Sequence, residues 1–434
     1  MDRLDIIGGV PLAGRVPIGG AKNAALPAMT AALLTDQPVT LAGVPNVGDV
    51  RTMAELLGTL GVAIDRDERD SSMTLRVGDD RSATADYQLV RRMRASICVL
   101  GPLLAKRGRA RVALPGGCQI GHRPVDVHLR ALEQLGATIR LERGDIVAET
   151  TRLRGAEVSL LGPSGSTATG TCNVLAAASL ARGRSVLRDA AREPEVVDFG
   201  ELLVAMGAQV DGLGTSTLEV AGVESLQGPA QPHAVIPDRI EAATLAMAAG
   251  MVDGSRVTLN GLRADHLQST AERLDAAGLH VEVDRNGRDG DAWTVTRRGP
   301  LRPVEAFATP YPGLPTDVQA QLAAVLTQAD GTSSIGDRVF PERFGYVGEL
   351  VRLGATMTRT ERGVVLTGPS RLVGCDVLAS DLRASAALVL AGLAAEGTTR
   401  VRRIYHLDRG YDCLERKLSA LGANIARVRD EHPY

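Results

Sequence analysis

A phrase that recurs six times constrains the fold of this chain more than any other feature of its sequence. Each copy reads as a β-like run, a polar turn, an amphipathic helix and a glycine that opens another strand-like run. Consecutive glycines are 68 to 76 residues apart, at Gly61, Gly136, Gly207, Gly278, Gly354 and Gly422. Six units of about 72 residues therefore fill the 434-residue chain, a period typical of repeat architectures.

The glycine of each phrase has a structural explanation. In the second unit, Val125, Leu129, Leu132 and Leu135 recur at roughly helical spacing, and Gly136 follows directly. A glycine just past the end of a helix adopts left-handed backbone without a steric penalty. We therefore interpret all six glycines as helix-ending residues.

A second type of helix lies between these phrases and is rich in small residues. Such helices have hardly any polar face, so they are expected to be buried. Each unit then has strands outside and a small-residue helix inside, and six units form two globules of three with a ligand cleft between them. The segment 228–232 is a Gly- and Pro-rich crossover after the third unit. The small-residue helices include 24–34, 175–180, 242–251 and 385–393.

Composition excludes several classes of function. A single hydrophobic core seldom reaches this length, so at least two domains are expected. The 49 Lys and Arg against 51 Asp and Glu give a net charge of -2, which argues against a dedicated nucleic-acid binder. An anionic ligand must therefore meet a local cluster of Arg and Lys. Aromatic residues make up only 3% of the chain, too few for a base-stacking surface.

The cysteines and the apolar runs indicate a cytoplasmic protein. Five cysteines without paired spacing indicate reduced thiols, and no metal-ligand spacing is present, so we predict no metal site. The charged N-terminus is unlike a signal peptide, and no apolar run approaches the length of a membrane span. The cysteines are Cys98, Cys118, Cys172, Cys375 and Cys413.

One segment resembles the catalytic loop of a known enzyme family. Residues 115–126, Pro-Gly-Gly-Cys-Gln-Ile-Gly-His-Arg-Pro-Val-Asp, resemble that loop in UDP-N-acetylglucosamine 1-carboxyvinyltransferase. Further segments match the family in the same order, so the resemblance covers essentially the whole chain. Each motif is short, but the set is specific. The other segments are 20–24, 93–96, 191–195, 311–317, 381–385 and 405–411.

The resemblance implies a fold and an activity. The fold is the two-globule inside-out α/β barrel of the enolpyruvyl transferases, in which the N-terminal strand joins the C-terminal half. The expected globules are 22–235, and 1–21 with 236–434, with the active site in the cleft between them. The implied reaction transfers the enolpyruvyl group of phosphoenolpyruvate to the 3′-hydroxyl of UDP-N-acetylglucosamine. It is the first committed step of peptidoglycan precursor synthesis. No cofactor is implied, because Arg and Lys neutralise the phosphates.

Cys118 is the predicted general acid toward C3 of phosphoenolpyruvate. It lies between an apparent strand and a helix, with glycines on both sides. Such a segment allows a mobile loop with a reactive thiol. The resemblance also implies participation in product release and alkylation by the epoxide antibiotic fosfomycin. The alternative is an ordinary buried cysteine. We assign that core role to the other four cysteines.

Several cations are predicted to bind the phosphate and carboxylate groups. Lys22 opens a small-residue helix, where a phosphate also finds free N–H groups, and the family assigns Lys22 and Asn23 to phosphoenolpyruvate. The alternative for Lys22 is a solvated helix start. Arginines of the same role are Arg94, Arg123 and Arg409, with Arg343 and Arg383 as weaker candidates. For any single arginine the alternative is a surface charge, and for Arg383 it is a pairing with a carboxylate.

Asp317 is the predicted base. The resemblance implies that its carboxylate hydrogen-bonds the sugar 3′-hydroxyl and accepts its proton. Lys22 and Arg409 complete the predicted catalytic set with Cys118 and Asp317. Asp317 also stands just before a helix over 319–326, so the alternative is a capping or first-turn residue. Both roles are compatible if Thr316 is the cap.

A strip of residues matches the uridine-binding segment of the family, with Asp126 as an acceptor for uracil N3–H or simply a first-turn carboxylate. His128 matches a family histidine, although a histidine on a helix is usually structural. The strip is Arg123, Pro124, Val125, Asp126 and Val127, and Val339 matches another contact.

Segment 165–173 departs from the family, which usually reads Val-Ser-Val-Gly-Ala-Thr-Glu there. Ser166, Thr167 and Ala168 still offer hydroxyl groups and space for phosphate. The departure favours two alternatives. One is a paralogue that acts on another uridine nucleotide, and the other is a silent nucleotide-binding paralogue. The joint presence of Lys22 and the other three predicted catalytic residues argues against the silent form. Shikimate 3-phosphate enolpyruvyl transferases share the fold but lack such a cysteine loop.

Overall fold

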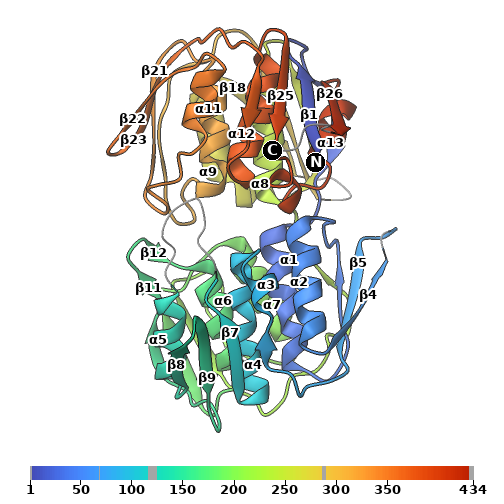
Figure 1. The fold of residues 1–434 in the computed structure, drawn as a ribbon, viewed down its shortest axis with the longest axis vertical. Helices are drawn as coiled ribbons and strands as arrows, with labels where there is room; N and C mark the ends of the chain where they lie inside the picture. Colours follow the sequence, from blue (N-terminus) through green and yellow to red (C-terminus); the bar gives the residue numbers. More distant parts are fainter. Residues whose placement is uncertain (1, 68, 116–124, 286–289, 430–434) are drawn as a thin grey trace. The chain divides into compact units, whose positions relative to one another are not determined.

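The chain forms two compact units (Figure 1). The computed structural model describes residues 2–67, 69–115, 125–285 and 290–429. Residues 20–236 form one unit, called here the repeat 1–3 unit, and residues 2–19 with 237–429 form the other, the repeat 4–6 unit. The chain therefore passes between the units twice, after Gly19 and after Ile236.

The described residues contain six four-stranded sheets that share one strand order, and each repeat supplies three or four strands of one sheet. In the fifth repeat, β20 (Glu305–Ala308) lies parallel to β21 (Gly331–Asp337), which pairs antiparallel with β23 (Gly363–Gly368). The far edge is β22 (Thr356–Thr360), antiparallel to β23. The shared order follows from the sixfold phrase, because each copy supplies most of the strands of one sheet in the same sequence.

The other strands take equivalent positions. In the repeat 1–3 unit they are β3 (Val39–Ala42), β4 (Val62–Asp67), β5 (Ser72–Val77), β6 (Thr84–Ala85), β7 (Arg109–Ala113), β8 (Thr138–Glu142), β9 (Asp145–Glu149), β10 (Glu157–Ser159), β13 (Arg184–Arg188), β14 (Gln209–Asp211), β15 (Thr217–Ala221) and β16 (His233–Ala234). In the repeat 4–6 unit they are β1 (Asp2–Ile7), β2 (Ala13–Pro17), β17 (Arg256–Leu262), β18 (Leu279–Asp284), β19 (Asp291–Arg297), β24 (Asp376–Leu378), β25 (Thr398–Arg402) and β26 (Asn424–Arg429). A two-stranded hairpin joins β11 (Leu161–Gly162) to β12 (Gly165–Ser166).

The N-terminal strands complete the repeat 4–6 unit. Strand β1 lies between β25 and β26, with Ile6 opposite both Thr399 and Ile425. Strand β2 lies parallel to β17 and forms an edge of the fourth sheet. In the repeat 1–3 unit, β16 completes the first sheet as an edge strand parallel to β3. The expectation that the N-terminal strand joins the C-terminal half is confirmed.

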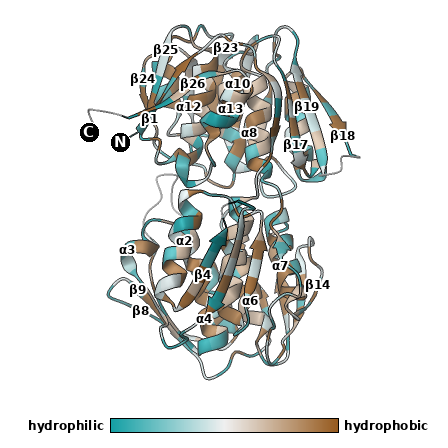
Figure 2. Ribbon diagram, turned by 90° about the vertical axis from the view of Figure 1, so that its right-hand side faces the viewer, coloured by the Kyte–Doolittle hydropathy of each residue, from teal (hydrophilic) through white to brown (hydrophobic). Residues whose placement is uncertain are grey.

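Interior helices form the core of each unit, as the small-residue segments predict. Every residue of α8 and α10 is buried, and α10 packs against both α8 and α12. Figure 2 shows apolar residues gathered in the interior of each unit, where α6 and α10 lie. None of the helices in the described ranges combines the length and the apolar character that crossing a bilayer requires. The interior helices are α1 (Lys22–Thr30), α4 (Leu100–Arg107), α6 (Ala168–Ser179), α8 (Arg239–Ala249), α10 (Gln319–Leu326) and α12 (Leu382–Ala394).

The six phrase helices end as predicted. In each, the repeat glycine follows the C-cap residue and has a left-handed φ between +82° and +104°. The interpretation of these glycines as helix-ending residues is therefore confirmed. The helices are α2 (Gly48–Thr59), α5 (Asp126–Gln134), α7 (Pro194–Ala205), α9 (Gln268–Ala276), α11 (Val347–Arg352) and α13 (Leu414–Ala420), and a further short helix is α3 (Tyr87–Val90).

Two of these glycines give a matched test of the fold. Both Gly61 and Gly136 have positive φ, so alanine costs about 1 kcal/mol at either position. A Cβ at Gly61 would lie 1.8 Å from the carbonyl oxygen of Asp79, whereas at Gly136 it would meet nothing within 4 Å. We expect Gly61→Ala to lower the free energy of unfolding by about 2–4 kcal/mol and Gly136→Ala by about 1 kcal/mol. Urea unfolding followed by circular dichroism measures both, and equal losses would contradict the clash.

The cysteine prediction is only partly correct. Cys98 and Cys172 are buried, and burial raises the pKa of the Cys98 thiol to about 12. Cys375 is partly buried and packs against the core of the repeat 4–6 unit. Cys413 is partly exposed, so a core role is wrong for it, because it lies in the loop directly before the outer helix α13.

Candidate active site

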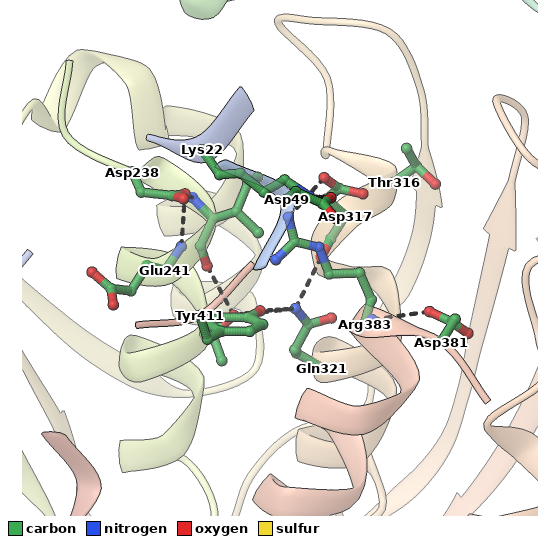
Figure 3. A network of polar contacts seen from close by, with 12 residues as sticks. Lys22, Asp49, Asp238, Glu241, Thr316, Asp317, Gln321, Asp381, Arg383 and Tyr411 are labelled. Carbon is green, nitrogen blue, oxygen red and sulfur yellow. Dashed lines mark hydrogen bonds and ion pairs between the residues drawn. The ribbon is translucent and has the colours of Figure 1, made fainter. Parts of the chain in front are cut away.

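Two buried arginines, Arg343 and Arg383, hold Asp317 at the start of an interior helix. Figure 3 shows Arg383 beside Asp317. Asp317 lies in the short 3₁₀ turn η4 (Thr316–Val318), directly before α10. Its carboxylate accepts hydrogen bonds from Nη1 of Arg343 at 2.7 Å and from Nη2 of Arg383 at 2.9 Å. The arginine side chains are 8% and 3% exposed, whereas the Asp317 side chain is 23% exposed. The carboxylate is therefore the accessible member of a buried cationic cluster.

The two guanidinium groups have spare N–H donors. Nε and Nη1 of Arg383 and Nε of Arg343 are buried and have no hydrogen-bond partner among the described residues. Burial by itself lowers the pKa of Arg383. The charge interactions with Asp317 and Tyr411 raise the pKa by more than burial lowers it, so the net pKa lies above its ordinary value. Arg383 therefore remains charged. Buried, charged N–H groups without partners suit a carboxylate or a phosphate.

Neighbouring elements fix the position of Arg383. The Asp381 side chain caps α12 by accepting from the backbone N–H groups of Arg383 at 2.9 Å and Ala384 at 3.2 Å. The guanidinium carbon of Arg383 lies 5.2 Å from the ring centre of Tyr411, within cation–π range. The Tyr411 hydroxyl lies 2.8 Å from that of Thr244 on α8. The capped helix start and the Tyr411 ring, itself bonded to Thr244, therefore restrict where the guanidinium group can lie.

Thr316 does not cap α10, so that alternative is wrong. The N-cap of α10 is Val318, and it makes no side-chain capping bond. The Thr316 hydroxyl instead donates to Asp337 at 2.5 Å and accepts from Arg343 Nη1 at 3.1 Å. The buried Asp337 competes for that hydroxyl because its carboxylate needs hydrogen-bond donors, and burial raises the pKa of Asp337. The carboxylate of Asp317 is thus engaged by arginines and not by a helix end.

Lys22 is buried and ion-paired. It is the first residue of α1, and its Nζ lies 3.0 Å from Oδ2 of Asp49 in the first turn of α2. The side chains are 11% and 5% exposed. The solvated-lysine alternative is therefore wrong, because a buried carboxylate holds the ammonium group at the start of an interior helix.

The other predicted residues of the repeat 1–3 unit also stand at helix starts. Asn23 is exposed and follows Lys22 in α1, and Arg94 is partly buried and begins the 3₁₀ helix η2 (Arg94–Val99). Val125 is the N-cap residue of α5, Asp126 is its exposed first residue, and Val127 is buried. N–H groups at helix starts favour anions.

Segment 165–173 forms the end of the small hairpin and the start of α6. Ser166 ends β12, and Thr167 is the N-cap residue, whose hydroxyl accepts from the N–H of Gly170 at 3.2 Å. Ala168 is the first helical residue, and all three are partly exposed. Segment 165–173 thus supplies the cap and the first turn of α6 despite its unusual sequence.

Two further predicted residues lie in the repeat 4–6 unit. The N–H of the partly buried Val339 donates to Oδ1 of Asp337 at 2.8 Å. Arg409 ends the 3₁₀ turn η5 (Leu407–Arg409) and is partly buried. Burial lowers the pKa of the neighbouring His406, and the charge of Arg409 lowers it further. Cys118, Arg123 and Pro124 lie outside the described residues.

The structure adds Asp49 to the site, which sequence reasoning missed. Asp49 and Lys22 are 27 residues apart, and nothing in the local sequence distinguishes Asp49 from an ordinary first-turn carboxylate. The sequence predicted Asp317 as a base and gave pairing with a carboxylate as the alternative for Arg383. In the structure these two residues are each other's partners.

Family and sequence comparisons identify the relatives of this chain. Residues 6–418 match the family model of EPSP synthase (3-phosphoshikimate 1-carboxyvinyltransferase). The chain is 52% identical over 432 residues to UDP-N-acetylglucosamine 1-carboxyvinyltransferase of Anaeromyxobacter dehalogenans, covering 99% of this chain and 100% of the relative. It is 46% identical over 428 residues to the protein of the same name from Methylacidiphilum infernorum, covering 99% of each.

Solved structures show the same architecture. The enolpyruvyl transferase NikO from Streptomyces tendae matches with a TM-score of 0.87 and 28% identity, covering 98% of each chain. EPSP synthase from Acinetobacter baumannii matches with a TM-score of 0.74 over 99% of this chain and 100% of that one, at 17% identity, which supports the fold alone. The predicted inside-out α/β fold of six repeats is confirmed.

Proposed function

Because the chain belongs to the UDP-N-acetylglucosamine 1-carboxyvinyltransferase family, we propose that it transfers the enolpyruvyl group of phosphoenolpyruvate to the 3′-hydroxyl of UDP-N-acetylglucosamine, releasing phosphate. The protein is thus an enolpyruvyl transferase acting on small molecules. The reaction serves the synthesis of peptidoglycan precursors for the cell wall. We propose that the reaction takes place in the cytoplasm.

The observation that carries the proposal is the cluster around Asp317. An accessible carboxylate, two buried guanidinium groups and their unoccupied N–H donors lie within hydrogen-bond reach of one another. A reaction that removes a proton from a hydroxyl beside a carboxylate- and phosphate-bearing substrate needs this combination of a base and fixed cations. The cluster supports Asp317 as the base and Arg383 as an anion-binding residue.

The chemistry breaks the C–O bond of phosphoenolpyruvate and leaves the P–O bond intact. C3 takes a proton, which makes C2 electrophilic, and the sugar oxygen adds to C2 as its proton passes to Asp317. Departure of phosphate and loss of a proton from C3 restore the double bond as an enol ether. We assign protonation of C3 to Cys118, on the sequence argument above.

The remaining predicted residues divide by unit. In the repeat 1–3 unit, we propose that Lys22, Asn23 and Arg94 bind the anionic groups of the substrates. The starts of α5 and α6 are proposed to bind the nucleotide, through Arg123 to Val127 and through Ser166 to Ala168. In the repeat 4–6 unit, Arg409 and Arg383 are proposed to bind phosphate or carboxylate, and Val339 the nucleotide. Lys22, Asn23, Arg94, Val125 to Val127 and Ser166 to Ala168 are supported by their positions at helix starts, Arg383 by its bond to Asp317, and Val339 by its bond to Asp337. The roles of Arg123, Pro124 and Arg409 rest on the family motifs in the sequence.

One feature favours a second candidate, transfer to another uridine nucleotide. Segment 165–173 differs from the family pattern, and in the structure it supplies the N-cap and first turn of α6. A change in sequence at this helix start alters the hydrogen-bond donors available to a phosphate, and it leaves Asp317 and Lys22 unchanged. The acceptor, and not the chemistry, is therefore the part of the proposal that needs the most direct test.

The test measures phosphate released from phosphoenolpyruvate by the full chain, with UDP-N-acetylglucosamine or another uridine diphosphate sugar as acceptor. We expect turnover with UDP-N-acetylglucosamine. We expect Cys118→Ala to lower it by about 10²–10⁴-fold, as for loss of a general acid. The matched control is Cys375→Ala, because Cys375 is a partly exposed thiol outside the site, and this variant should retain activity.

Three results would change the assignment. Turnover only with the other nucleotide would transfer the proposal to a paralogous acceptor. Binding without phosphate release by a folded chain would favour the silent nucleotide-binding form. Full activity of Cys118→Ala, or lack of inactivation of the parent by fosfomycin, would remove Cys118 from the mechanism.

A further inference from the structure

A buried asparagine joins four segments of the repeat 1–3 unit. Asn173 lies on the interior helix α6 and is 1% exposed. Its Oδ1 accepts from the N–H of Gly101 at 2.6 Å, and its Nδ2 donates to the carbonyl oxygen of Ile97 at 3.2 Å. The same Nδ2 lies 3.1 Å from Nδ1 of His128, which is 3% exposed. These contacts connect α6 with α4, η2 and α5.

The partners of Asn173 determine the protonation of His128. A backbone N–H only donates and a backbone carbonyl only accepts, so Gly101 requires Oδ1 and Ile97 requires Nδ2 in the observed places. The group that faces His128 is therefore the amide NH₂, a donor. Nδ1 of His128 must accept, which makes the imidazole neutral with its proton on Nε2.

Three of the four joined segments carry residues proposed to bind substrate. Ile97 is in η2, which begins at Arg94, and His128 is in the first turn of α5, next to Val127. Helix α6 begins at Ala168, within two turns of Asn173. Helices α4 and α6 approach closely at Gly101, because a Cβ at this position would lie 2.0 Å from the backbone carbonyl oxygen of Asn173.

We propose that Asn173 and His128 are positioning residues that hold η2, α5 and α6 in the register that nucleotide binding needs. The inference rests on the proposed function. Apolar packing tolerates small sliding of helices, whereas a directional hydrogen bond between buried groups specifies one arrangement. Neither residue is proposed to touch the reacting atoms, so their loss should weaken binding of UDP-N-acetylglucosamine and leave the chemical step nearly intact.

The test compares two substitutions at one position. His128→Leu removes the acceptor and leaves one Asn173 N–H buried without this partner. His128→Asn places an oxygen where Nδ1 stood, so the bond from Asn173 is retained. We expect His128→Leu to raise the calorimetric Kd of UDP-N-acetylglucosamine by about 5- to 30-fold, with kcat changed by less than about threefold. His128→Asn should restore Kd to within about threefold of the parent value.

A control separates positioning from general loss of stability. Leu75 is fully buried in β5, in the first sheet of the same unit, and Leu75→Ala should lower the melting temperature without changing Kd. An unchanged Kd in His128→Leu, or an equal rise in Leu75→Ala, would overturn the inference and leave the proposed function standing. A parent that neither binds nor turns over UDP-N-acetylglucosamine would overturn the proposed function and the inference with it.

Discussion

Replacing Asp317 by asparagine is expected to lower kcat by a factor of about 10² to 10⁴. The amide still fills the space of the carboxylate, but it cannot accept the proton of the sugar hydroxyl. Its NH₂ group must also face one of the two guanidinium groups that now donate to the carboxylate, Arg343 or Arg383. Steady-state phosphate release at saturating substrates measures the effect.

The same substitution should destabilise the repeat 4–6 unit. Removing one partner of a buried ion pair costs up to about 3–5 kcal/mol, and the partial exposure of Asp317 places the expected loss toward the lower end. Trp293, the only tryptophan of the chain, is buried in this unit, so its fluorescence follows the unfolding. Inorganic phosphate should stabilise Asp317→Asn more than the parent, because an added anion replaces the lost charge.

A matched control is Asp376→Asn. Asp376 also accepts from two arginines, Arg402 at 2.8 Å and Arg400 at 3.3 Å, but it lies on the edge strand β24 and is more exposed. We expect this variant to keep kcat within about twofold, because exposed pairs contribute at most about 1 kcal/mol. A kcat for Asp317→Asn that also stays within a few-fold of the parent value would exclude Asp317 as the base.

Lys22→Met is expected to lower kcat/KM for phosphoenolpyruvate by about 10²–10³-fold, the loss typical of one fixed charge at a reacting anion. It also leaves the carboxylate of Asp49 buried without this ammonium group, at a cost of about 3–5 kcal/mol. Kinetics as a function of phosphoenolpyruvate concentration and urea unfolding measure the two effects separately.

A second substitution separates the two effects. Lys22→Met combined with Asp49→Asn removes the uncompensated charge, so stability should recover while activity stays low. Lys106→Met is the control, since Lys106 pairs with Asp36 at 2.8 Å on the surface and should cost less than about 1 kcal/mol. If activity returned with stability in the double variant, Lys22 would be a structural residue only.

The repeat pattern predicted the fold because it depends on local chemistry. The sixfold glycine lies at helix ends in every copy, and the small-residue segments are the interior helices, for example α8 and α12. A helix end and a buried face are both encoded within one or two turns of chain, so a single sequence suffices to predict them. The predicted core role of Cys413 is wrong because apolar neighbours in sequence do not reveal which face of a loop meets solvent.

The sequence by itself determined the six repeats, the two kinds of helix and, through family motifs, the candidates Lys22, Asp317 and Arg383. Only the tertiary structure decided what each of these meets. Asp317 meets arginines 26 and 66 residues away, Lys22 meets Asp49 27 residues away, and His128 meets Asn173 45 residues away. The strength of a charge or a hydrogen bond depends on burial and on the distance to its partner, and both arise only when distant segments pack together.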